Sequence, residues 1–197
     1  MGLPPKLFSK LNRKGIAFEP GLTDREIEGI RQVFGVTFPI DLKEFLQTGL
    51  PVSERFVPWR AALNNEADAV VVKERLRRPL EGLYFSIEHN HFWWEAWGEK
   101  PATLEDQKAR LAEVFPQYPV LIPIYSHRYI PSSPDLTKNP VFSVVGTDII
   151  YYGNDLVSYF EHEFGFTIPW RYGEEPPVRH IPFWSEIVAW NDTRFAR

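Results

Sequence analysis

The chain has 197 residues, a length that suits one large domain, and 44% of them are hydrophobic, which excludes a disordered chain. Its formal net charge of −4 disfavours nonspecific attachment to nucleic acid, and the absence of Cys excludes disulfides, thiolate metal sites and Cys nucleophiles. No apolar run approaches the roughly 20 residues that span a bilayer, and the opening MGLPPKLFSKLNRKG lacks the apolar region of a secretory signal. We therefore expect a cytoplasmic protein that does not enter a membrane.

The chain begins with an arm and two short helices. Residues 1–21 mix Pro, Lys and Gly and predict an arm that lies over the domain. Thr23 and Glu26 form a capping-box pattern at the start of a helix that Gly35 ends. After an extended link that contains Pro, a second helix is predicted over 40–48. The two helices should form a compact cap over one end of a core.

The next third of the chain mixes several signals. Residues 56–59 fit a short strand or a docked loop, and a helix is predicted over 66–76. The basic run KERLRR at 73–78 is interrupted and followed by acids, so we interpret it as a solvated helix face. The aromatic segment that follows predicts a strand over 84–88 and then a Trp-rich loop or helical turn. Another helix should begin after Thr103.

The centre of the predicted sheet lies in residues 119–164. Short runs rich in Val, Ile, Phe and Tyr predict three strands, at 120–125, 140–145 and 149–152. A helix over 156–164 follows them, and Gly165 ends it. The tail, 166–197, predicts a wrapping extension with a short helix near 184–190.

These elements define a fold class. We predict an α+β protein whose mainly antiparallel central sheet is flanked by helices, with an extended C-terminal tail. Because the sequence has no internal repeat and no low-complexity linker, residues 1–197 should form one domain. Its core should span about 22–165, between the arm and the extension.

Few residues combine into a catalytic pattern. His89 and His91 would share one side of the predicted strand, as two metal ligands can, but no third ligand is assured. Ser126 and His127 are neighbours and would point to opposite faces of a strand, so they do not form a nucleophile and base. The sequence also lacks a Gly-rich phosphate loop and a Gly-x-Ser-x-Gly elbow. We therefore predict no catalytic residues, no metal and no cofactor.

One different class of function stays open. Glu88 and Glu95 flank a tryptophan-rich segment. Sugar rings stack on such aromatics, and paired carboxylates supply the acid and base of glycoside hydrolysis. The alternative is thus a carbohydrate-binding or glycoside-hydrolysing protein, with two carboxylates about 5 to 10 Å apart beside exposed Trp rings.

Three segments of the chain resemble the SUKH superfamily, which includes the yeast cell-wall-assembly regulator and many bacterial toxin-immunity proteins. The first, between 22 and 46, is similar to the family's opening helix, its link of Gly, an apolar residue and Pro, and its second helix. The second, LIPIY at 121–125, is similar to the family's central strand. The third, from NPVFSV at 139–144 to the helix that ends at Phe164, resembles its paired strands and closing helix. The segment 50–116 and the tail depart from the family pattern.

The resemblance implies a non-catalytic protein-binding module, most often an immunity protein that covers a cognate toxin domain, in many cases a nuclease. A mildly acidic chain suits a basic toxin. Aromatic anchors in a polar rim are typical of such contact surfaces. The candidate partner-binding residues are therefore Trp93, Trp94, Glu95 and Trp97, together with a loop of His127, Arg128 and Tyr129. The alternative for each Trp is burial, and the identity of the toxin and the oligomeric state stay open.

Overall fold

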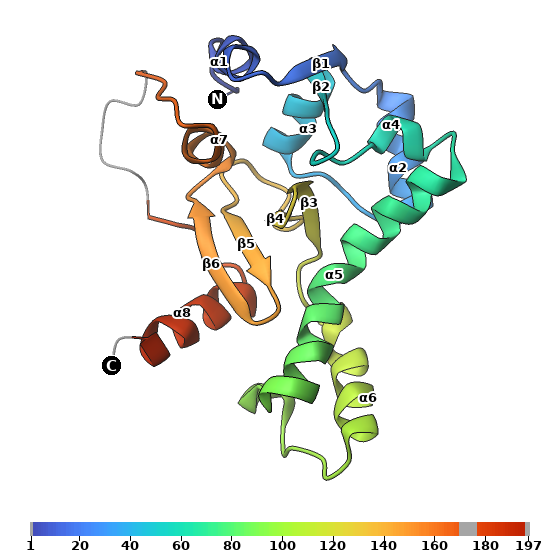
Figure 1. Cartoon of the computed structure of the whole chain (residues 1–197), viewed down its shortest axis with the longest axis vertical. Coiled ribbons are helices and arrows are strands. Elements are labelled where there is room, and N and C mark those ends of the chain that lie inside the picture. Colours follow the sequence, from blue (N-terminus) through green and yellow to red (C-terminus); the bar gives the residue numbers. More distant parts are fainter. Residues whose placement is uncertain (1, 170–176, 196–197) are drawn as a thin grey trace.

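A computed structural model describes residues 2–169 and 177–195 and confirms the α+β class (Figure 1). The helices are α1 (Leu7–Arg13), α2 (Asp24–Phe34), α3 (Ile40–Thr48), α4 (Trp59–Ala62), α5 (Glu66–Asn90), α6 (Leu104–Val114), α7 (Leu156–Phe164) and α8 (Trp184–Phe195), with two 3₁₀ turns, η1 (Glu95–Trp97) and η2 (Phe115–Gln117). The strands are β1 (Ala17–Pro20), β2 (Gly49–Val52), β3 (Leu121–Tyr125), β4 (Arg128–Pro131), β5 (Val141–Val145) and β6 (Asp148–Gly153).

The strands form two antiparallel sheets. A small sheet pairs β1 with β2, and the central sheet has the order β3-β4-β5-β6. Each central strand pairs with its neighbour in sequence, so short turns suffice to connect most of them. The predicted antiparallel sheet is therefore confirmed.

Each face of the central sheet packs against its own hydrophobic core. Alternate side chains enter opposite cores, because successive residues of a strand point to opposite faces. Ile122, Ile130 and Val141 join the core that α1, α2, α3, α4 and α7 cover. Leu121, Tyr129, Phe142, Val144 and Ile149 join the second core, together with α6, α8 and the second half of α5. The helix α5 contributes Ala69 and Val72 to the first core and Leu83 and Ile87 to the second, and Figure 1 shows it running from α4 past β3 to α6.

The two helices predicted over the first part of the chain are confirmed, and the first has its predicted cap. The side chain of Thr23 accepts from the Glu26 amide, and Glu26 bonds back to the Thr23 amide at 2.7 Å. Gly35 adopts the left-handed conformation that ends α2, with φ 69°. The second helix has the predicted bounds and buries Leu42 and Phe45.

The strand predicted over 84–88 is wrong, and so is the end predicted for the preceding helix. Both segments belong to α5, which runs from Glu66 to Asn90. Tyr, Phe and Ile favour strands, but Leu83 and Ile87 are one helical turn apart and both enter the second core. Burial of that face therefore makes the segment helical in spite of its strand-favouring residues. Since there is no strand at this position, His89 and His91 do not share one side of a strand.

The predicted loop at 127–129 is also wrong. Arg128 and Tyr129 open β4, which pairs with β5 through Arg128–Ser143 and Tyr129–Phe142. Only Ser126 and His127 form the turn between β3 and β4. The two ends of the chain also contribute to the cores, because Leu7 and Leu11 of α1 and Trp184 of α8 are fully buried.

Candidate functional site

The Trp-rich segment follows α5 and packs its rings against the second core. Trp97 is 1% exposed, and its indole N–H donates to the Tyr118 hydroxyl at 2.9 Å. The half-buried Trp93 meets Trp97 edge-on, with ring centroids 5.2 Å apart. Trp94 is half-buried and meets Phe183 in the same way. Of the four candidate residues in this segment, Glu95 alone is exposed.

The carboxylates of the carbohydrate alternative have different surroundings. Glu88 forms an ion pair with Lys108 at 2.5 Å, and this hydrogen bond lowers the pKa of Glu88. Glu95 lies on η1. Because Trp97 is buried, the sugar hypothesis keeps only the partly exposed Trp93 and Trp94 as stacking surfaces. No contact favours it over the binding module.

The second candidate group, His127, Arg128 and Tyr129, is largely internal. Arg128 is 9% exposed; its Nε donates to Glu163 at 2.9 Å, and its guanidinium carbon lies 3.6 Å from the centroid of the Tyr152 ring. Tyr129 is fully buried, and His127 is half-buried. Burial, followed by the nearby Arg128, lowers the pKa of the His127 ring. His127 is thus the member of this group that a partner could reach most directly.

Tyr129 and Trp97 share the second core, but the structure does not bring the accessible parts of the two groups together. The β3–β4 turn is held at the loop before α4, where the Ser126 amide donates to the Arg55 carbonyl at 2.9 Å. The Trp-rich segment lies beyond the C-terminal end of α5 (Figure 1). A single contact surface made of both groups is therefore not present in this arrangement.

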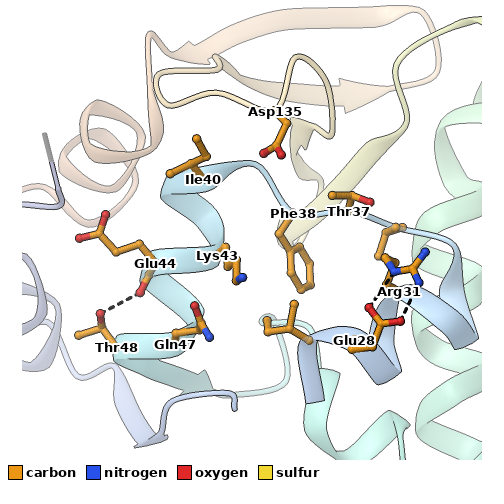
Figure 2. A pocket seen from close by; sticks show the side chains of 12 residues that line it. Glu28, Arg31, Thr37, Phe38, Ile40, Lys43, Glu44, Gln47, Thr48 and Asp135 are labelled. Carbon is orange, nitrogen blue, oxygen red and sulfur yellow. Dashed lines mark hydrogen bonds and ion pairs between the residues drawn. The ribbon is translucent and has the colours of Figure 1, made fainter. Parts of the chain in front are cut away.

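A groove that the sequence did not reveal lies between α2 and α3 (Figure 2). It has a volume of about 670 Å³. Its lining residues come from α2, the following link, α3 and one distant loop: Ile27, Glu28, Arg31, Val36, Thr37, Phe38, Ile40, Lys43, Glu44, Gln47, Thr48 and Asp135. Concave sites of this size are where proteins bind ligands and partner side chains.

The groove has an apolar base and a polar rim. Phe38 and Val36 are almost fully buried beneath it, whereas the Ile40 side chain at its edge is 47% exposed. On the rim, Arg31 forms a close ion pair with Glu28 at 2.6 Å. An exposed apolar side chain within a polar rim is typical of protein contact surfaces.

Local signals in the sequence build the walls of the groove. Gly35 ends α2 in the left-handed conformation, and Pro39 is the extended N-cap of α3. The link between the helices is therefore short and directed, and it places Phe38 between them. These signals predicted both helices, whereas the exposure of Ile40 is seen only in the structure.

A buried aspartate connects the distant loop to α3. The Asp41 carboxylate accepts from the Leu42 amide and, at 2.9 Å, from the amide of Lys138. Burial raises the pKa of Asp41 above its usual value, and the two amide bonds oppose that rise. This contact holds the loop of residues 132–139, and with it Asp135, at the groove. It joins residues 97 positions apart, so no local pattern could predict it.

Two other kinds of feature are absent from residues 2–169 and 177–195. No three or more His, Cys, Asp or Glu side chains lie together as metal ligands. Over the same residues, no helix combines the length and the apolar character needed to cross a membrane.

No protein-family model, curated protein or solved structure matches the chain. The fold and the site define it as an α+β domain with an open groove between its first two long helices. The SUKH resemblance stays a prediction that rests on the three sequence segments.

Proposed function

We propose that the chain is a non-catalytic protein-binding module whose partner docks on the groove between α2 and α3. The observation that carries this proposal is the composition of the groove. Ile40 is exposed beside buried Phe38, and charged side chains surround both. A partner side chain that packs on this apolar base would exclude water, while the rim would set its orientation.

We further propose that the module acts as an immunity protein that neutralises a cognate toxin domain, such as a nuclease, by covering its surface. The segment at 22–46 that resembles the SUKH opening contains α2 and most of α3, the two helices of the groove. The net charge of −4 favours encounter with a basic protein through electrostatic steering. The proposal thus links the resemblance and the groove to the same part of the chain.

The test uses a matched pair of exposed isoleucines. Ile40 lines the groove, and Ile150 lies on β6 outside it; they are 47% and 44% exposed. The full-length wild-type chain, Ile40→Arg and Ile150→Arg would each be immobilised and exposed to lysate of the source organism. Proteins that wild type and Ile150→Arg retain, but Ile40→Arg does not, would be identified by mass spectrometry.

The retained protein would then be expressed in a test host with and without the chain. We expect it to arrest growth alone, and the wild-type chain to restore growth while Ile40→Arg does not. Equal capture by both variants would place the partner away from the groove. A captured protein that is harmless by itself would contradict the immunity role.

A further inference from the structure

One carboxylate of the groove has neither an ion pair nor a hydrogen bond with any residue that the structure describes. The Arg31 guanidinium is paired with Glu28 at 2.6 Å, and Lys43 lies 3.8 Å from Asp24 of α2. Both cations of the lining therefore have an acid beside them. Asp135 has no ion pair or hydrogen bond among the residues that the structure describes.

The fourth acid of this region, Glu44, serves the N-terminal segment. Its Oε1 accepts from the Leu3 amide at 2.8 Å. In Figure 2 its carboxylate points away from the groove, whereas the Asp135 carboxylate points into the space between Ile40 and Phe38. A negative charge is thus presented directly above the apolar base.

Asp135 sits on a loop that the rest of the chain fixes in place. Asn139 is fully buried, and its side-chain amide donates to the carbonyls of Pro131 and Pro134 at 3.1 and 2.8 Å. Arg179 donates to the side-chain oxygen of Asn139 at 2.6 Å and to the Thr137 carbonyl at 2.8 Å. Because the loop is held from several sides, a ligand of Asp135 would lose little free energy in ordering it.

We propose that the groove binds a partner segment in which a Lys or Arg side chain reaches Asp135 and a neighbouring apolar side chain packs on Ile40 and Phe38. This inference rests on the proposed binding role of the groove and names the chemistry of its partner. Charge complementarity favours a basic occupant, because both cations of the lining already lie beside acids and neither of them pairs with Asp135. The exposed Ile40 selects an apolar neighbour for that cation.

The probe is a display library of random 12-residue peptides, selected on the immobilised full-length chain. Peptides that Ile40→Arg no longer binds would be synthesised, and their Kd for the full-length chain measured. We expect these groove-dependent peptides to share a Lys or Arg next to a large apolar residue. Asp135→Asn should weaken them about two- to fivefold, which is the range of a partly exposed ion pair.

A charge swap makes the test specific. The variant Asp135→Lys should lose the basic peptides and bind the same peptides with Glu in place of the basic residue. Asp148, an exposed acid at the far end of the central sheet, provides the control: Asp148→Lys should leave every Kd unchanged. Added salt should weaken binding to wild type more than to Asp135→Asn, because salt screens the exposed pair.

The outcomes separate the two levels of the proposal. Groove-dependent peptides that lack a basic residue, or that Asp135→Lys binds as well as wild type does, would overturn the basic occupant and leave the binding role standing. If none of the selected peptides depends on Ile40, the groove is not a binding surface, and both the inference and the proposed function fail.

Discussion

A tyrosine hydroxyl takes the place of a missing backbone hydrogen bond in α5. Pro79 lies inside this helix and has no N–H, so the carbonyl of Arg75, four residues earlier, lacks its usual partner. The Tyr129 hydroxyl, on β4, donates to that carbonyl at 3.0 Å. Since Tyr129 is 1% exposed, water has little access to replace the bond.

We expect Tyr129→Phe to lower the free energy of unfolding by about 1–2 kcal/mol. A net hydrogen bond contributes about 1 kcal/mol, and a buried carbonyl left unpaired costs about 1–3 kcal/mol. The aromatic ring stays in the second core, so its packing is conserved. Urea denaturation of the full-length chain would measure the change, with an unaltered m value as the sign that both states keep their compactness.

Tyr159 supplies the matched control. It is equally buried, and its hydroxyl has no hydrogen-bond partner among the described residues; burial raises its pKa well above the usual value. Removing a hydroxyl that has lost water without gaining a bond should cost nothing, so Tyr159→Phe should leave stability unchanged or raise it.

A second comparison tests the link to Pro79. In the Pro79→Ala background, the restored N–H can bond to the Arg75 carbonyl, so Tyr129→Phe should cost about 0.5–1 kcal/mol less than it does in the wild type. The reasoning is refuted if Tyr129→Phe and Tyr159→Phe have the same effect. It is equally refuted if Pro79→Ala does not change the cost of Tyr129→Phe.

Two further predictions concern one ion pair and one close approach. The hydrogen bond from Arg60 is the main cause that lowers the pKa of Glu26 to about 2. Because the unfolded pKa is 4.5, the ionised carboxylate stabilises the fold by about 1–3 kcal/mol above that pH. This contribution is lost as the pH falls toward 2. Thermal melts across this pH range should show that Glu26→Gln loses less stability on acidification than the wild type does. An unchanged dependence of stability on pH would contradict the assignment. A Cβ on Gly82 would lie 2.9 Å from the Gly146 Cα, so Gly82→Ala should destabilise by about 1–3 kcal/mol despite the better helix propensity of Ala. In Gly29→Ala, the other helix glycine, the Cβ would meet only a side chain, and denaturation should show no comparable loss; equal effects would count against the close approach.

Local signals predicted the parts of the fold that depend on a few neighbouring residues. Thr23 and Glu26 fix the start of α2 because they satisfy the free amides of a helix terminus. The helix α7 begins in the same way, with Asp155 accepting from the Ser158 amide at 2.8 Å. Such patterns are complete within one turn, so they can be recognised without the rest of the chain.

The long helix α5 shows where local signals fail. Pro79 and the strand-favouring residues at 84–87 both argue against a continuous helix. The structure answers each with a distant contact. Tyr129 satisfies the carbonyl that Pro79 frees, and the second core buries Leu83 and Ile87 from one helix face. Because the compensating residues lie in β4 and the core, the segment could not be assigned from its own sequence.

The candidate site divides in the same way. Both helices of the groove were predicted, but the loop that carries Asp135 is held in place by distant contacts, among them the one between Asp41 and Lys138. A groove between predicted helices could therefore be expected, whereas its charge could not.

The buried tryptophans of the second core already have hydrogen-bond partners, which makes them a poorer contact surface than the groove. A buried indole needs a partner for its N–H. Trp97 donates to Tyr118, and Trp184 of α8 donates to the Pro119 carbonyl at 2.7 Å. These rings therefore complete the second core, and a partner could use them only by breaking bonds already made. At the groove, Asp135 has no counter-ion among the described residues and the Ile40 side chain is exposed, so a partner that supplies a cation and an apolar side chain gains both contacts without disrupting the fold.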